Sequence, residues 1–340
     1  MNLLFRTDAS VAMGTGHAMR CLALAQAWID SGRRAAFAMA EATPSIQKRL
    51  ASERCEALAI SAKAGDLEDA KQTIALAHQA RSEWIVVDGY QFTFEYQSAL
   101  KAAGCKVLFL DDYGHASRYS ADLVLNQNVC AREALYASRE AYTRLLLGPR
   151  YALLRREFAP WRGWKREVAS TCRRLLVMMG GSDPGNLTGR VISALERFHD
   201  LEVTVVVGGS NPHLAELVGH VERSGQTITL EQDVANMPEL MATADVAFSA
   251  AGSTCWELCL MALPAMLIDV AANQTALAKE LDRSGCAVHV GDRTVSASAI
   301  AEVLGRMLGS WELRRLLSQR CRTLVDGGGT GRVLSELAPG

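Results

Sequence analysis

The sequence has few aromatic residues, almost no net charge and no long apolar segment. Aromatic residues make up 6% of its 340 residues, and the formal net charge is −1. A polyanion would find no global positive field, so we predict no nucleic-acid partner. No apolar run approaches the roughly 20 residues that span a bilayer, so we predict no integral membrane segment. Because Arg6 and Asp8 interrupt the first apolar run, we also expect no signal peptide.

The sequence also lacks the motifs of several metal and nucleotide sites. Its 9 cysteines include no C-x-x-C pair, which argues against a zinc cage or a disulfide framework and favours the reduced cytoplasm. There is no D-x-D motif to hold a metal on a pyrophosphate. Met19 stands where a dinucleotide fingerprint needs its third glycine, so a nicotinamide-dependent dehydrogenase is not expected.

The hydrophobic pattern alternates between short β-branched runs and helical-period stretches, which is typical of βα units around a parallel sheet. The expected strands are residues 3–6, 35–40, 84–88, 106–111 and 123–126, followed by 174–179, 203–207, 227–230, 246–249, 265–270 and 287–290. The expected helices are residues 17–30, 67–80, 94–103, 186–198, 213–223, 253–262 and 275–284. At about 150 residues per domain, the length indicates two domains. We predict an N-terminal domain over 1–150, a linker over 151–173 and a C-terminal domain over 174–340.

The predicted linker is rich in arginine and lysine. It contains Phe158, Trp161 and Trp164 among the basic residues of the stretch 150–174. One interpretation is a solvated linker whose tryptophans pack on a domain. The other is a patch that meets a membrane surface or a lipid acceptor.

The first βα loop carries the strongest candidate for a catalytic base. Gly14 and Gly16 let the backbone approach a ligand just before a helix begins. His17 stands at the mouth of that helix, where the positive end of the helix dipole favours a neutral imidazole that can act as a base. The structural alternative is a histidine that only caps the helix.

Two further strand ends in the first half carry polar residues. Asp88 and Tyr90 follow one expected strand, and open α/β sheets bind ligands at such ends. Asp111, Asp112 and His115 follow the next strand. They could bind a metal and activate water, as in a metal-dependent deacetylase, or form a turn that only holds polar side chains.

In the second half, two loops suit a pyrophosphate. Gly180, Gly181 and Ser182 follow an expected strand and precede a helix, so we expect a loop that faces a phosphate. Ser253 and Thr254 stand at another helix start, where hydroxyls and backbone N–H groups can hold a pyrophosphate.

Three other polar residues are candidates for contacts with the rest of a nucleotide sugar. Glu257 lies one turn into the helix that follows Ser253 and could accept hydrogen bonds from two ribose hydroxyls, or it is an ordinary acid of a first turn. Asn273 and Gln274 open the next helix and could contact sugar hydroxyls and amides, or serve as a cap.

Taken together and in order, these loops resemble one known family. The motifs are GTGH at 14–17, DGY at 88–90, DDY at 111–113, YALLRREF at 151–158, MGGSD at 179–183 and AANQ at 271–274. They resemble the UDP-sugar hydrolases of bacterial pseudaminic acid biosynthesis, which serve flagellin glycosylation and are related to the glycosyltransferase that adds N-acetylglucosamine in lipid II synthesis. The segment ELCLMALP at 257–264 resembles the nucleotide-binding element of that glycosyltransferase. The similarity covers residues 3–290.

The resemblance implies a fold, a reaction and a set of roles. The fold would be GT-B, with two Rossmann-like domains facing a cleft and UDP held mainly by the C-terminal one. Water would attack the anomeric carbon of UDP-2,4-diacetamido-2,4,6-trideoxy-β-L-altropyranose and release UDP and the free sugar with inversion, without a metal or another cofactor. His17 would be the base, Tyr90 and Asn273 would line the sugar site, and Glu257 would bind the ribose.

Two other functions use the same residues. The chain could be a glycosyltransferase that moves such a sugar to an acceptor, or a nucleotide-sugar-binding protein without catalytic activity. In each case the expected partner is a UDP-sugar. The similarity leaves residues 292–340 unassigned, where the run Gly327-Gly328-Gly329 is expected to form a turn before a last helix or to contact a phosphate.

Overall fold

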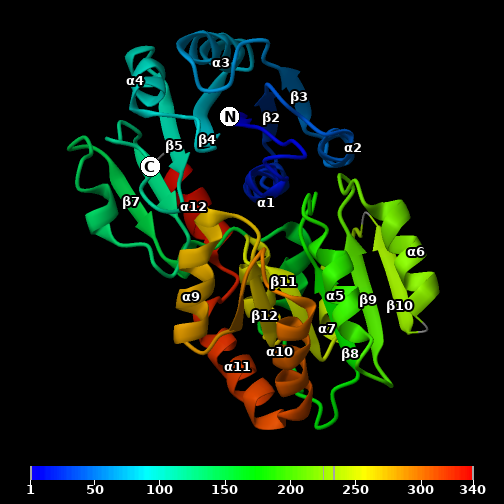
Figure 1. Ribbon diagram of the computed structural model, residues 1–340. Helices are drawn as coiled ribbons and strands as arrows, with labels where there is room; N and C mark the ends of the chain where they lie inside the picture. Colours follow the sequence, from blue (N-terminus) through cyan, green and yellow to red (C-terminus); the bar gives the residue numbers. More distant parts are fainter. Residues whose placement is uncertain (1, 225, 233, 339–340) are drawn as a thin grey trace. The chain divides into compact units, whose positions relative to one another are not determined.

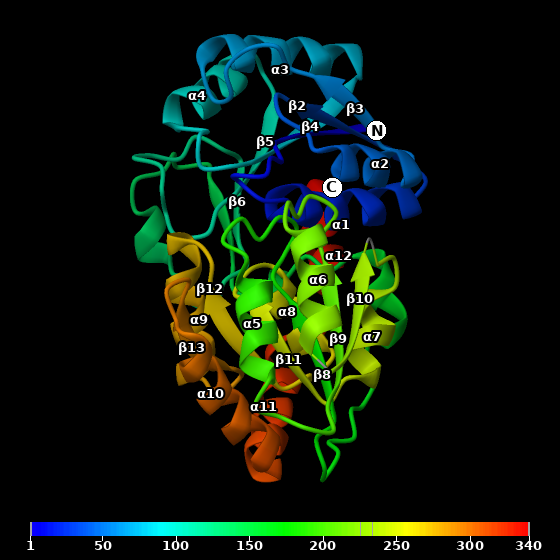
Figure 2. The same cartoon turned by 45° about the vertical axis from the view of Figure 1, so that its right-hand side comes forward.

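The computed structural model describes residues 2–224, 226–232 and 234–338, and the chain divides into two compact units. Unit 1 consists of Met1–Arg156 together with Gly328–Gly340, and unit 2 consists of Glu157–Gly327. Each unit is built on its own parallel β-sheet with helices on both faces (Figures 1 and 2). Such α/β units are what the alternating strand and helix pattern predicts.

Unit 1 contains a 7-stranded sheet in the order β3-β2-β1-β4-β5-β6-β7. Every neighbouring pair is parallel. The strands are β1 (Asn2–Thr7), β2 (Arg34–Met39), β3 (Glu56–Ala59), β4 (Ser82–Asp88), β5 (Lys106–Leu110), β6 (Leu123–Asn126) and β7 (Arg144–Leu147). The helices are α1 (Gly16–Asp30), α2 (Pro44–Ser52), α3 (Leu67–Gln79), α4 (Phe94–Ala102) and α12 (Gly329–Leu337), with short 3-10 turns η1 (Glu133–Tyr136) and η2 (Pro149–Tyr151).

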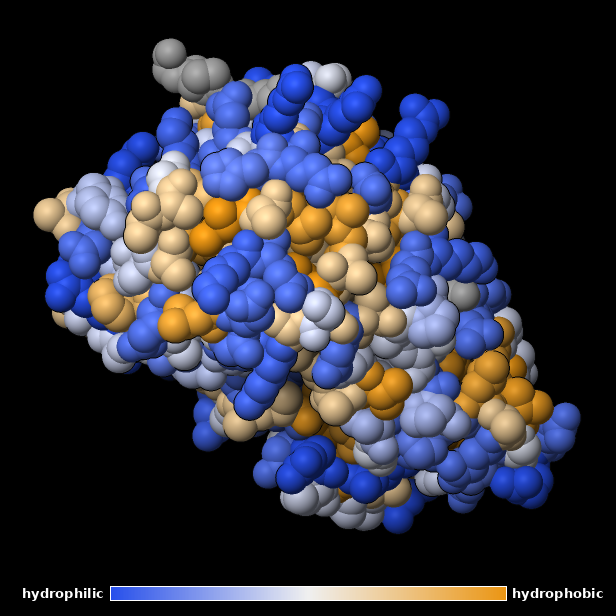
Figure 3. All heavy atoms as spheres, turned by 90° about the horizontal axis from the view of Figure 1, so that it is seen from above, coloured by the Kyte–Doolittle hydropathy of each residue, from blue (hydrophilic) through white to orange (hydrophobic). Residues whose placement is uncertain are grey.

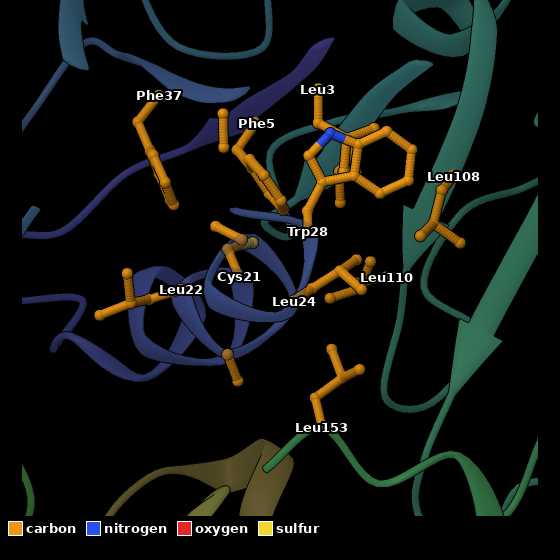
Figure 4. Packing of buried hydrophobic residues seen from close by; sticks show 14 of the residues in the cluster. Leu3, Phe5, Cys21, Leu22, Leu24, Trp28, Phe37, Leu108, Leu110 and Leu153 are labelled. Atoms are coloured by element: carbon orange, nitrogen blue, oxygen red, sulfur yellow. The ribbon is translucent and has the colours of Figure 1, made fainter. Parts of the chain in front are cut away.

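Alternate residues of β1 point to opposite faces of this sheet, and each face has its own core. Leu3 and Phe5 pack in the core that also contains α1 and α12, while Leu4 packs in the core that contains α3 and α4. The views agree that α3 and α4 lie on one side of the sheet and α1 on the other. Figure 4 shows fully buried Trp28 of α1 beside Leu3 and Phe5. This packing fixes α1, and therefore His17, against the ends of the central strands.

Unit 2 contains a 6-stranded sheet in the order β10-β9-β8-β11-β12-β13, again parallel throughout. The strands are β8 (Arg174–Met178), β9 (Glu202–Val207), β10 (Thr227–Gln232), β11 (Val246–Ala250), β12 (Ala265–Asp269) and β13 (Val288–Asp292). The helices are α5 (Leu187–Leu195), α6 (Leu214–Ser224), α7 (Met237–Thr243), α8 (Thr254–Leu260), α9 (Thr275–Arg283), α10 (Ala297–Gly309) and α11 (Trp311–Leu324), and η3 (Arg156–Trp161) and η4 (Ala272–Gln274) are 3-10 turns.

The expected linker is not a free connection, because an arginine ties it to unit 2. Arg166 is buried and donates hydrogen bonds to the carbonyl oxygens of Met241, Ala244 and Met261, at 2.5, 2.6 and 2.9 Å. Phe158 is also buried. Burial lowers the pKa of Arg166 to about 10. The basic stretch is therefore in part an internal support of unit 2, and Phe158 and Arg166 take no part in a surface patch.

The C-terminal boundary differs from the expected one. Residues 174–340 were expected to form one domain, but α12 returns to unit 1. Thr330 of α12 accepts a hydrogen bond from the backbone N–H of Leu154, and Val333 and Leu337 are buried in the core beside α1. The expected turn and last helix at residues 327–337 are present. The sequence pattern could not reveal that this helix completes the first unit, because an apolar helix face does not specify its partner.

All eleven expected strands coincide with strands of the structure, and the alternating pattern is confirmed. Two edge strands of unit 1, β3 and β7, were missed, together with α2, α7, α10 and α11. In β3, three of the four residues are exposed and none is buried, so it lacks the apolar run that marks a buried strand.

The described residues contain no helix that is long and apolar enough to cross a membrane. On the face drawn in Figure 3, hydrophilic side chains predominate and hydrophobic areas lie between them.

Candidate functional site

The candidate catalytic residues of unit 1 lie where the strand order reverses. β1 and β4 are adjacent in the sheet, and their helices α1 and α4 follow on different faces. The carboxyl ends of such a pair open a crevice that α/β proteins use for ligands. The loop after β1 leads to His17, and β4 ends at Asp88. The structure thus brings the GTGH and DGY motifs together at one edge of the sheet.

His17 is held by a buried carboxylate. Its Nδ1 lies 2.7 Å from Oδ1 of Asp88, whose side chain is fully buried. The His17 side chain is 11% exposed, and the described residues provide no hydrogen bond to Nε2. The expectation of a histidine that only caps the helix is not met, because its ring nitrogen bonds to β4 instead.

Asp88 also forms an ion pair with an arginine that the sequence analysis did not single out. Arg20 Nε lies 2.6 Å from Asp88 Oδ2, and Nη2 lies 2.7 Å from Oδ1. Its Nη1 donates to Oδ1 of Asp112 at 2.6 Å. Although burial alone would raise the pKa of Asp88, the charge of Arg20 and the hydrogen bonds from Arg20 and His17 hold it well below its ordinary value. Asp88 is therefore ionised throughout the physiological range.

Aromatic side chains border the His17 ring. Tyr90 contacts His17 edge to face, with ring centroids 4.9 Å apart, and Tyr113 lies 5.2 Å from Tyr90. The hydroxyl of Tyr90 donates to Oδ2 of Asp112 at 2.6 Å. Burial and the charge of Asp112 raise the pKa of Tyr90, so it is a neutral phenol. Tyr113 is 43% exposed and offers an aromatic face at this edge of the sheet.

The possible metal site at the end of β5 is occupied by hydrogen bonds within the protein. Asp111 accepts bonds from the backbone N–H groups of residues 112, 113 and 114, from the Tyr119 hydroxyl and from His115 Nδ1. Among the described residues, no group of three or more histidines, cysteines or acids could hold a metal ion. These contacts favour the second interpretation, a turn that holds polar side chains.

In unit 2, the loop after β8 packs against a second loop, and its expected contact with a phosphate stays a prediction. The Gly181 carbonyl accepts a hydrogen bond from Ser210 N, and a Cβ on Gly208 would lie 2.3 Å from the same oxygen. The two similar loops, 180–184 and 208–212, are therefore packed against each other. Gly180 has a φ of 84°, which favours glycine, and Ser182 is buried.

The other expected nucleotide-binding residues of unit 2 surround the end of β11. Ser253 precedes α8, which begins at Thr254, and Glu257 is 9% exposed on its first turn. The side chain of Gln274 does not cap α9, contrary to one of the two expectations. Its Oε1 instead accepts a hydrogen bond from Val270 N at 3.0 Å. A Cβ on Gly252 would lie 3.8 Å from Gln274 Nε2, so η4, which carries Asn273, lies beside the turn at Ser253.

Comparisons with known proteins place this geometry in a family. The model of the glycosyltransferase family 28 C-terminal domain matches residues 175–312. The spore coat polysaccharide biosynthesis protein SpsG of Bacillus subtilis is 30% identical over 235 residues, which cover 68% of each chain. The chain belongs to the SpsG family.

Two further proteins are similar to this SpsG-family chain over most of its length. The UDP-2,4-diacetamido-2,4,6-trideoxy-β-L-altropyranose hydrolase of Campylobacter jejuni is 26% identical over 287 residues, which cover 84% of this chain and 97% of the relative. The crystal structure of MurG from Acinetobacter baumannii has a TM-score of 0.65 and 15% identity, with 99% of each chain covered. This likeness and the matched domain confirm the GT-B fold with its two Rossmann-like units.

Arg20 and the function of Asp112 as its second acceptor were not predicted from the sequence of this SpsG-family chain. A signal for Arg20 was present. It lies three residues after His17, on the same side of the helix, within a run of otherwise apolar or small residues from 18 to 25. An arginine there has to be buried with a carboxylate, because an unpaired buried charge is costly.

Proposed function

We propose that the chain hydrolyses a UDP-linked 2,4-diacetamido-2,4,6-trideoxy sugar to UDP and the free sugar. The observation that carries the proposal is the position of His17 on the GTGH loop. Asp88 holds the ring at Nδ1, which leaves Nε2 for water. The similarity to the hydrolase of Campylobacter jejuni, which runs through both units, supports this reaction class.

The proposed mechanism begins with proton transfer from water to His17 Nε2. The water oxygen forms a bond to the anomeric carbon while the bond from that carbon to the UDP oxygen breaks, so the configuration inverts. The electron pair leaves with UDP, and His17 later returns its proton to solvent. Positioned general bases of this kind contribute roughly 10²- to 10⁴-fold to a rate.

Unit 2 supplies the proposed UDP-binding residues. The diphosphate oxygens would accept hydrogen bonds from backbone N–H groups near Gly180, Gly181, Ser182, Ser253 and Thr254. The Glu257 carboxylate would accept hydrogen bonds from the ribose hydroxyls. A diphosphate that is stabilised in this way is a good leaving group without a general acid. Tyr90, Gly14 and Gly16 on unit 1 and Asn273 and Gln274 on unit 2 are proposed sugar contacts.

The test is UDP release from the UDP-diacetamido sugar in the absence of acceptor and added metal. His17→Ala and His17→Gln should lower the rate by about 10²-fold or more, because each removes the base. His78→Ala, which removes an exposed histidine of α3, is the matched control and should be fully active. An unchanged rate in both His17 variants would refute the assigned base, and no UDP release by the unaltered chain would refute hydrolysis.

A second candidate function is a glycosyltransferase with the same donor. The matched glycosyltransferase family 28 C-terminal domain favours it. UDP release that begins only when a membrane fraction or a soluble acceptor is added would identify a transferase. NMR of the products distinguishes the two reactions, because the sugar is released free in one and appears bound to the acceptor in the other.

A further inference from the structure

His17 and Arg20 share one acceptor, and this fixes the proton of the imidazole. His17 Nδ1 and Arg20 Nη2 each lie 2.7 Å from Asp88 Oδ1, and they are 3.3 Å from each other. If Nδ1 carried a lone pair, it would face a carboxylate oxygen at hydrogen-bond distance, which is repulsive. Nδ1 therefore carries the hydrogen and donates to Asp88, and in the neutral ring the lone pair is on Nε2.

The charge around His17 is set by one cation between two carboxylates. Asp88 stands at the end of β4 and Asp112 follows β5, and Arg20 of α1 binds both. With Arg20, the two carboxylates have a combined charge of −1. Without it, two negative charges would remain, and a nearby negative charge favours imidazolium.

The other titratable groups facing this cluster are neutral or paired. The Cys21 thiol of α1 lies 3.5 Å from Asp88, and burial together with the Asp88 charge raises its pKa. The Tyr90 phenol donates a hydrogen bond to Asp112 and contacts the His17 ring edge to face. His115 is paired with Asp111 and contacts Tyr90 edge to face, and the charges of Asp111 and Asp112 both act to raise its pKa. Arg20 is thus the one cation in direct contact with Asp88 among the described side chains, apart from His17 when protonated.

We propose that Arg20 is a positioning residue that offsets one of the two carboxylate charges beside His17 and so keeps His17 in the unprotonated state, with Nε2 as the accepting atom. Asp88 alone would orient the ring but would also hold it as imidazolium, which cannot take a proton from water. Arg20 separates these two effects, because it offsets part of the carboxylate charge and leaves the hydrogen bond from His17 to Asp88 intact. The function in catalysis rests on the proposed hydrolysis, but the effect on the His17 proton does not.

The first measurement is an NMR titration of the His17 ring in the full chain. In Arg20→Gln, which removes the charge but keeps hydrogen-bonding groups, we expect the titration midpoint of His17 to rise by about 1 pH unit or more. Arg20→Lys keeps the charge and should restore a midpoint near that of the unaltered chain. The matched control is Arg33→Met, which removes a cation that lies over Trp28 in the same unit, 4.3 Å from the ring centroid; it should leave the midpoint unchanged.

The second measurement is the pH profile of UDP release. A base that titrates 1 unit higher moves the acidic limb of the profile up by 1 unit, so the rate of Arg20→Gln should fall about 10-fold on that limb and recover at alkaline pH. A merely structural function of Arg20 would lower the rate at every pH. If the unaltered chain releases no UDP, hydrolysis is refuted while the titration still decides the function of Arg20.

A variant with the opposite charge change gives a further test. Asp88→Asn removes the carboxylate but leaves Arg20, so the His17 midpoint should fall instead of rising. Opposite shifts in the two variants would support the proposal. An unchanged midpoint in folded Arg20→Gln would overturn it, and if that variant fails to fold, a midpoint in Asp88→Asn that does not fall would overturn it equally.

Discussion

Replacing Gly329 by alanine should detach α12 from unit 1. A Cβ at this position would lie 2.3 Å from the Ala152 carbonyl oxygen and 2.5 Å from its nitrogen. Ordinary contacts of a Cβ begin at 3.4 Å, so either the helix or the facing backbone at Ala152 has to move by about 1 Å. Both colliding atoms belong to the main chain, and no side-chain rotation can relieve the collision.

The magnitude follows from what α12 loses when it moves. The hydrogen bond between Leu154 N and Thr330 is worth about 1 kcal/mol. Val333 and Leu337 are 0% and 1% exposed, and full burial of each is worth about 1.5–3 kcal/mol. If half of that burial is lost, Gly329→Ala should lower the free energy of unfolding of unit 1 by about 3 kcal/mol.

The helix offers its own control. Gly331 is exposed on α12, and a Cβ there would meet no atom within 4 Å. Gly331→Ala should therefore be neutral or stabilise by up to about 1 kcal/mol, since alanine favours a helix over glycine. Urea unfolding followed by near-UV signals of unit 1, with hydrogen exchange of α12, compares the two variants. Equal stability of Gly329→Ala and Gly331→Ala would refute the packing argument.

Two other predictions concern buried charges. Although burial would lower the pKa of His115, the hydrogen bond and charge of Asp111 raise it. The pair therefore stabilises the fold fully when the pH is below the unfolded pKa of about 6.5. This stabilisation is lost as the pH rises through the folded pKa. His115→Gln should therefore destabilise more at pH 5.5 than at pH 8.5 in urea unfolding; a larger loss at pH 8.5 would contradict this sign. Arg166→Met should destabilise unit 2 by about 2–4 kcal/mol, because three buried carbonyl oxygens lose their donor while relief from burying the charge offsets part of the cost. Calorimetry that finds unit 2 unchanged would rule out this support.

The sequence predicts the central strands well because they are buried on both faces. β6 was expected at its observed bounds. All four of its residues are buried, and all but Asn126 are apolar. β3 was missed for the opposite reason, because an exposed edge strand needs no apolar run. The return of α12 to unit 1 was also missed, since the pattern of a helix records which face is apolar but not which sheet covers it.

The candidate site divides in a similar way. His17, Asp88 and Tyr90 could be found because glycines and strand ends mark the loops that carry them. Arg20 could not be assigned in this way, because its function depends on two carboxylates that follow different strands and meet only in the folded unit. Gln274 was expected to contact a ligand or cap a helix. Its side-chain oxygen accepts from the backbone N–H of Val270, a bond that no spacing predicts, so it does not cap α9, and the contact with a ligand stays a prediction.

The position of α12 in unit 1 has a consequence for how the protein is made. Unit 2 occupies a continuous segment, Glu157–Gly327, so its sequence is complete before the last residues are synthesised. Unit 1 begins first but lacks α12 until Gly329–Leu337 leaves the ribosome. Since domains generally fold as units during synthesis, the second unit can acquire its native structure while the first still exposes the apolar surface that Val333 and Leu337 will cover. The half of the chain that is translated first can therefore be the half that finishes folding last.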